Sequence, residues 1–148
     1  MRWRFVDRVT AFEPWRRIAG RKAVSLEEYQ LLKPFGREGV LPESLVLESC
    51  VEHVRWLAAA SSGFQQACVL EAVEGFNFSG QAGMGAVLEV EAKLAGGAGA
   101  GPLQASCRVT AGGQEIAAGR ITLGLVPLAE SFDRDFVESL WREIHAQA

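Results

Sequence analysis

The segment from residue 42 to residue 58 constrains the fold of this chain more than any other part of the sequence. Its first residue, Pro42, favours the start of a helix, because proline is well suited to the first helical turn. Apolar side chains then recur at helical spacing, which predicts a helix with one continuous apolar face. The residues of this face are Leu47, Cys50, Val51, Val54, Leu57 and Ala58.

The carboxylate of Glu48 lies among the apolar residues of this segment, and helical spacing places Glu52 and Arg55 on the same side of the helix as Glu48. A charged group in apolar surroundings costs free energy unless it is paired or has a functional role. Spacing alone leaves two interpretations open. In the first, the three residues form a solvated face with a Glu52–Arg55 ion pair worth roughly a few tenths of a kcal/mol. In the second, Glu48 is a functional carboxylate.

Length and composition indicate one folded domain, residues 1–148. A chain of 148 residues that is 49% hydrophobic can bury a sizeable core, which excludes a disordered protein. The net charge of −3 is spread over segments of mixed sign, so nucleic acid is not expected as a partner. No apolar run approaches the length of a membrane span, and residues 1–8 are charged, unlike a signal peptide. We therefore expect a cytoplasmic protein that is not inserted in a membrane.

The cysteines and histidines predict no disulfide and no metal site. Cys50, Cys68 and Cys107 lie in periodic apolar segments without C-x-x-C spacing, so we expect reduced core residues. The two histidines, His53 and His145, are too few and too far apart for a metal-ligand cluster, and no cofactor is expected. His53 lies about 140 degrees from Glu48 on an ideal helix, and we expect it at the surface or at the edge of the core.

Strand-like segments surround the predicted helix in the sequence, and a second helix ends the chain. Alternating or β-rich patterns predict strands at residues 4–13, 16–24, 66–78, 86–94, 103–111 and 115–126. Gly112-Gly113 suits a tight hairpin turn between the last two. From Ser131 onward, apolar residues repeat every four positions and predict an amphipathic helix at 131–147. The sequence leaves open whether this helix packs on its own domain or docks to a partner.

The order of these elements is compatible with an α+β fold in which an antiparallel sheet wraps around one buried helix. Two segments are similar to the hotdog-fold 3-hydroxyacyl-acyl-carrier-protein dehydratases. Phe5-Val6-Asp7-Arg8-Val9 resembles the family opening F/L-V-D-R-V, and residues 41–52, LPESLVLESCVE, resemble the family helix M-P-G-V-L-I-I-E-A-L-A-Q. The resemblance covers roughly residues 3–126 and implies a hotdog fold with an added C-terminal helix.

The resemblance also implies a site. Glu48 falls on the catalytic acid of the family, and the backbone N–H groups at the helix start can polarise a thioester oxygen. The acyl chain would lie in an apolar tunnel. The substrate-binding positions implied in this way are Phe35, Val40, Leu41, Pro42, Glu43 and Glu52.

This chain lacks the histidine that serves as the catalytic base in the family. An ungapped match to H-F-P-G-R-P-V-M-P places Pro34 at the family histidine, and proline cannot accept a proton. The neighbouring Lys33 would need a strongly lowered pKa to replace it, and nothing in the sequence provides for that. His145 lies in the last turns of the terminal helix, where a cation complements the helix dipole.

Three hypotheses follow for the function. The first, which we favour, is a degenerate or partner-dependent dehydratase-like subunit of fatty-acid or polyketide-type metabolism. It binds an acyl thioester on acyl-carrier protein or coenzyme A and lends Glu48 to a histidine-bearing paralogue. The second is an active dehydratase with a relocated base, or a thioesterase in which Glu48 activates water. The third is a structural homodimer without a ligand. We expect a homodimer, because a wrapped single sheet leaves edge strands exposed, and the first hypothesis also allows a heterodimer with the histidine-bearing paralogue.

Overall fold

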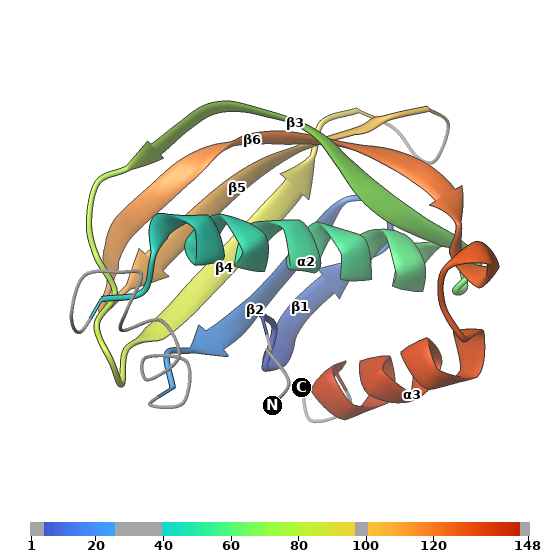
Figure 1. The fold of residues 1–148 in the computed structure, drawn as a ribbon, viewed down its shortest axis with the longest axis horizontal. Helices are drawn as coiled ribbons and strands as arrows, with labels where there is room; N and C mark the ends of the chain where they lie inside the picture. The colour runs from blue at the N-terminus through green and yellow to red at the C-terminus, as the bar shows by residue number, and fades with distance from the viewer. Residues whose placement is uncertain (1–4, 26–39, 97–100, 146–148) are drawn as a thin grey trace.

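Six antiparallel strands form one sheet that curves around a single long helix (Figure 1). The computed structural model describes residues 5–25, 40–96 and 101–145. The strand order is β1-β2-β4-β5-β6-β3. The elements are β1 (Arg8–Glu13), β2 (Arg17–Ala23), α2 (Glu43–Ser61), β3 (Gln66–Phe78), β4 (Val87–Leu94), β5 (Leu103–Ala111), β6 (Gln114–Pro127), the short 3-10 helix η1 (Leu128–Glu130) and α3 (Arg134–His145). The predicted α+β arrangement, a sheet around a central helix with a further helix at the C-terminal end, is confirmed.

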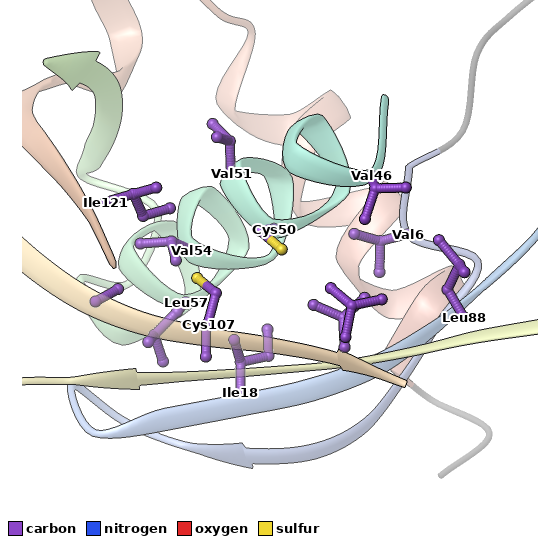
Figure 2. Close-up of a cluster of buried hydrophobic side chains, with 14 of the residues drawn as sticks. Val6, Ile18, Val46, Cys50, Val51, Val54, Leu57, Leu88, Cys107 and Ile121 are labelled. Carbon is purple, nitrogen blue, oxygen red and sulfur yellow. The ribbon is translucent and has the colours of Figure 1, made fainter. Parts of the chain in front are cut away.

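The core lies between α2 and the concave face of the sheet. Figure 2 shows apolar side chains of the helix pointing toward those of the strands. The predicted apolar face of the helix is buried, except that Leu47 is only partly covered. From the sheet, the core receives Ile18, Leu88, Cys107 and Ile121, all at most 4% exposed. Each buried aliphatic side chain of this size contributes roughly 1.5–3 kcal/mol, so this interface is the main source of stability.

Local sequence signals set the ends of these elements. Gly112 and Gly113 have φ angles of 59° and 81°, in the left-handed region that glycine occupies without strain. They form the tight turn between β5 and β6 that the sequence predicts. The strand β4 alternates as expected, with Leu88, Val90 and Ala92 buried beneath its charged residues. The three cysteines are buried and free, as predicted.

The C-terminal helix α3 packs on its own chain, which settles the question that the sequence left open. Trp141 and Ile144 are buried. The ring of Trp141 lies 5.1 Å from that of Phe12 in β1 and 5.8 Å from that of Trp56 in α2. The Oδ1 atom of Asp133 accepts a hydrogen bond from the backbone N–H of Asp135 at 3.0 Å and so caps the helix start. These contacts hold α3 across one end of the sheet, beside β1 (Figure 1).

His53 corrects a prediction made from the sequence. It is fully buried, not at the surface or the core edge, because the sheet covers its side of α2 completely. Its Nδ1 atom lies 2.7 Å from the carbonyl oxygen of Ser49 and donates to it, while Nε2 has no partner among the described residues. Gly20 in β2 allows this close packing, since a Cβ there would lie 2.6 Å from Nε2 and 2.6 Å from the Arg8 carbonyl. Burial lowers the pKa of His53 to about 4.

Candidate functional site

The start of α2 opens on a pocket of about 230 Å³. A backbone hydrogen bond of 2.8 Å from the Leu41 N–H to the Ala82 carbonyl joins the chain before the helix to the segment between β3 and β4. An isolated bridge between Val40 and Gly83 strengthens this junction. Four residues implied by the sequence line the pocket, together with residues of the helix and the sheet: Val40, Leu41, Pro42, Glu43, Val46, Phe78, Gly80, Gln81, Ala82 and Ile116.

The helix start presents backbone donors. Pro42 precedes the first turn with an extended backbone, and no side chain caps the helix there. The first backbone hydrogen bonds of the helix run from the Leu45 and Val46 N–H groups to the Pro42 carbonyl, at 3.0 and 3.3 Å. The N–H groups of Glu43 and Ser44 precede them at the positive end of the helix dipole. This end of α2 can therefore accept a partial negative charge, such as that of a polarised carbonyl oxygen.

A cluster of three charged residues, Glu48, Glu52 and Arg55, lies further along α2. The Nη1 atom of Arg55 is 2.5 Å from Oε1 of Glu52 and 3.5 Å from Oε1 of Glu48. The predicted Glu52–Arg55 pair is thus present, and Arg55 also reaches the carboxylate two turns away. The Glu48 side chain is 36% exposed. Burial raises its pKa above the usual value, Arg55 lowers it and the Glu52 charge raises it, with burial the largest effect.

The site residues implied by the sequence lie in two separate regions of the structure. Val40, Leu41, Pro42 and Glu43 meet at the pocket, whereas Glu48 and Glu52 do not line it. The Glu48–Glu52–Arg55 cluster faces the side of β3, where Arg55 lowers the pKa of the Cys68 thiol against the stronger effect of burial, which raises it to about 12. Pro34, Phe35 and Lys33 lie outside the described residues.

Sequence reasoning did not find the contribution of the sheet to the pocket. Phe78 and Ile116 lie at the end of β3 and near the start of β6, 38 positions apart. Only the register of those strands brings them to the helix start. The second contact of Arg55 could have been expected, because residues seven positions apart lie on the same side of a helix. Within the described ranges, no group of three or more His, Cys, Asp or Glu side chains could hold a metal ion.

No family model matches the sequence, and no curated protein matches it. Solved structures do match in fold. A hot-dog-like protein from Thermanaerovibrio acidaminovorans is 13% identical, with 88% of this chain and 92% of that chain covered and a TM-score of 0.64. The dehydratase heterocomplex ApeI:P from Xenorhabdus doucetiae is 14% identical, with 92% and 88% covered and a TM-score of 0.65.

A third similar structure is a hypothetical thioesterase with coenzyme A from Streptococcus pneumoniae. It is 11% identical, with 80% of this chain and 84% of that chain covered and a TM-score of 0.61. At these identities the similarity is one of fold. The curved antiparallel sheet around α2 is therefore a hotdog fold, as the sequence resemblance implied. Among the described residues, no helix is long and apolar enough to cross a membrane.

Proposed function

We propose that this chain binds an acyl thioester, carried on coenzyme A or on acyl-carrier protein. The observation that carries the proposal is the uncapped start of α2, which opens on a partly apolar pocket. A thioester needs both features, since its carbonyl oxygen accepts hydrogen bonds and its acyl chain is apolar. Two of the similar structures support the same ligand class, because one is a hypothetical thioesterase with coenzyme A and the other a dehydratase complex.

Glu48 does not line the pocket at the start of α2. The resemblance to the dehydratase family implies sites that combine residues of two protomers. We therefore expect Glu48 of one protomer to serve a thioester held at the α2 start of the second. In this arrangement the Glu43 and Ser44 N–H groups stabilise the charge that develops on the carbonyl oxygen.

The first candidate role is that of a partner-dependent dehydratase-like subunit. In this role Glu48 is the acid that gives a proton to the departing hydroxyl, and a histidine-bearing paralogue supplies the base. A proline stands at the position of the family histidine, so this chain has no base of its own at that position. This favours the partner-dependent role. The similar dehydratase from Xenorhabdus doucetiae is itself a heterocomplex, which makes a mixed dimer a reasonable form for this chain to take.

The second candidate role is that of a thioesterase in which Glu48 activates water. Arg55, 3.5 Å from Glu48, supports it, because this cation lowers the pKa of Glu48 against the larger effect of burial, which raises that pKa. The similar structure of a hypothetical thioesterase supports the same reaction class. If the chain binds neither coenzyme A thioesters nor acyl-carrier protein, the remaining hypothesis is a structural dimer without a ligand.

The experiment that tests the proposal compares the purified chain with a Glu48→Gln variant and a matched Glu89→Gln control. Glu89 lies on β4 in an exposed pair with Arg21, on the face of the sheet away from α2. Binding of acyl-coenzyme A and acyl-carrier protein is measured by calorimetry, and thiol release and hydration of a 2-enoyl thioester are followed separately. We expect binding in all three proteins. Any turnover should fall by about a hundredfold or more in Glu48→Gln only.

Each result has a distinct meaning. Thiol release that depends on Glu48 identifies a thioesterase. Turnover of the enoyl thioester only after a histidine-bearing relative is added identifies a partner-dependent subunit. Failure of both carriers to bind the wild-type chain contradicts the proposed function.

A further inference from the structure

We propose that the pocket at the start of α2 admits only a short acyl chain, of about eight carbons or fewer, and that Phe78 and Ile116 set this limit. The inference rests on the proposed acyl-thioester function and adds the class of acyl group to it. The sequence resemblance assigns no chain length. The limit follows from the size of the pocket, the packing behind it and the fixed position of one of its walls.

The pocket is small for a ligand site. Its volume is about 230 Å³, whereas pockets for drug-sized ligands usually have about 300–1,000 Å³. A cavity of about 150 Å³ in another protein holds benzene, which sets a scale of about 25 Å³ for each carbon atom. On that scale the pocket holds about nine atoms other than hydrogen. One of them is the thioester carbonyl oxygen, which leaves room for about eight carbons.

The core behind the pocket is filled. Leu41 and Val46 line the pocket and are only 5% and 3% exposed. Cys50, one helical turn beyond Val46, and Ala117, next to Ile116 on β6, are both 0% exposed, so no water-sized space adjoins their side chains. An acyl chain therefore cannot continue along α2 into the core without displacing close-packed side chains, which is costly.

Phe78 and Ile116 form the wall that the sheet contributes to the pocket, at the end of the molecule where β3 ends, β6 begins and α2 starts (Figure 1). Phe78 pairs with the buried Ala117 across the two strands, so its ring points to the same, concave face of the sheet. The Ile116 side chain is buried in the core cluster. Both side chains thus face the space that an acyl chain would occupy.

Backbone contacts hold this wall in place. The carbonyl oxygen of Ile116 accepts hydrogen bonds from the N–H groups of Ser79 and Gly80, at 2.8 and 3.3 Å. The Ser79 hydroxyl donates a further bond of 3.1 Å to the carbonyl oxygen of Glu115. Gly80 also packs closely on Ile116, since a Cβ at Gly80 would lie 2.9 Å from the Ile116 Cγ2 atom. We therefore expect the wall to stay closed when a longer chain is offered.

The test measures how affinity depends on chain length. Amide analogues of acyl thioesters, which keep the carbonyl oxygen but resist hydrolysis, are prepared from acetyl to dodecanoyl on coenzyme A and, in parallel, on acyl-carrier protein. Calorimetry measures their binding to the purified chain. Affinity should rise about fourfold with each added methylene up to about octanoyl, because each methylene buries apolar area, and should rise no further up to dodecanoyl.

Substitutions of Phe78 test the wall in both directions. Phe78 is only partly buried, so its replacement should disturb the fold less than replacement of Ile116. Phe78→Ala should move the point where affinity stops rising to decanoyl or longer, because it enlarges the pocket. Phe78→Trp should move it to hexanoyl or shorter. Phe12→Ala is the matched control, since Phe12 is also a partly buried strand residue but packs on Trp141 of α3, and it should leave the limit unchanged.

The outcomes separate this inference from the proposed function. Affinity that keeps rising to dodecanoyl in the wild-type chain, or a limit that Phe78→Ala and Phe78→Trp both leave in place, overturns the inference while acyl binding stands. Damage to the fold cannot imitate the expected result, because it weakens binding at every length and does not lengthen the preferred chain. If no analogue binds on either carrier, the proposed function fails and the chain-length limit fails with it.

Discussion

At the residue scale, His53 links stability to pH. Its pKa is about 4 in the folded chain, below the ordinary value of 6.5, because the neutral ring is fully buried. Between these two pH values the unfolded chain binds a proton that the folded chain does not. The free energy of unfolding should therefore be highest above about pH 6.5 and fall as the pH drops toward about 4, by about 3 kcal/mol at most. Urea unfolding at a series of pH values measures this fall.

The matched variant is His53→Leu, which fills a similar volume without a titrating group. The slope of stability between about pH 4 and 6.5 should be reduced in this variant. A wild-type chain whose stability does not change over that window would contradict the assignment of His53 as a neutral core residue.

Helical spacing placed His53 correctly, far around the helix from Glu48, but did not predict its burial. Spacing gives the angle between two side chains on one helix. The depth of a side chain depends on what covers it, and here that is β2, where Gly20 lets the ring approach the backbone. The same limit applies to Phe78 and Ile116 in the pocket, whose meeting depends on strand register.

At the scale of elements, α3 is held mainly by Trp141. Its ring packs against Phe12 and Trp56 and is 9% exposed. Trp141→Ala should cost about 3–5 kcal/mol of unfolding free energy, because it leaves a void between α3, β1 and α2. Denaturant unfolding measures the loss. Phe132→Ala is the comparison, since Phe132 is 56% exposed, and it should change stability by no more than about 0.5 kcal/mol. Equal effects of the two substitutions would show that α3 is not docked.

The whole molecule has one sheet edge suited to a second copy. β3 ends the strand order, and Val69 and Val73 on it are 51% and 42% exposed, whereas β1 at the other edge lies beside α3. Exposed edge strands tend to pair, so we expect a dimer with about twice the 16.0 kDa chain mass. Light scattering coupled to size-exclusion chromatography measures this mass.

A double substitution, Val69→Lys and Val73→Lys, should give the monomer, because lysine on an edge strand opposes pairing. Val87→Lys is the matched control, since Val87 is 46% exposed on β4, which has a neighbour on each side. A monomeric wild-type chain, or a dimer that survives the double substitution, would contradict pairing through β3.

The sequence by itself determined the elements of this protein. Helical spacing after Pro42, the alternation of β4 and the Gly112-Gly113 turn depend on side-chain period and backbone sterics, which act between near neighbours. Only the tertiary structure decided that β2 pairs with β4 and β6 with β3, that β3 and β6 supply part of the pocket, and that His53 is buried. These features join residues far apart in the chain. They depend on strand register and packing, which local periodicity does not determine.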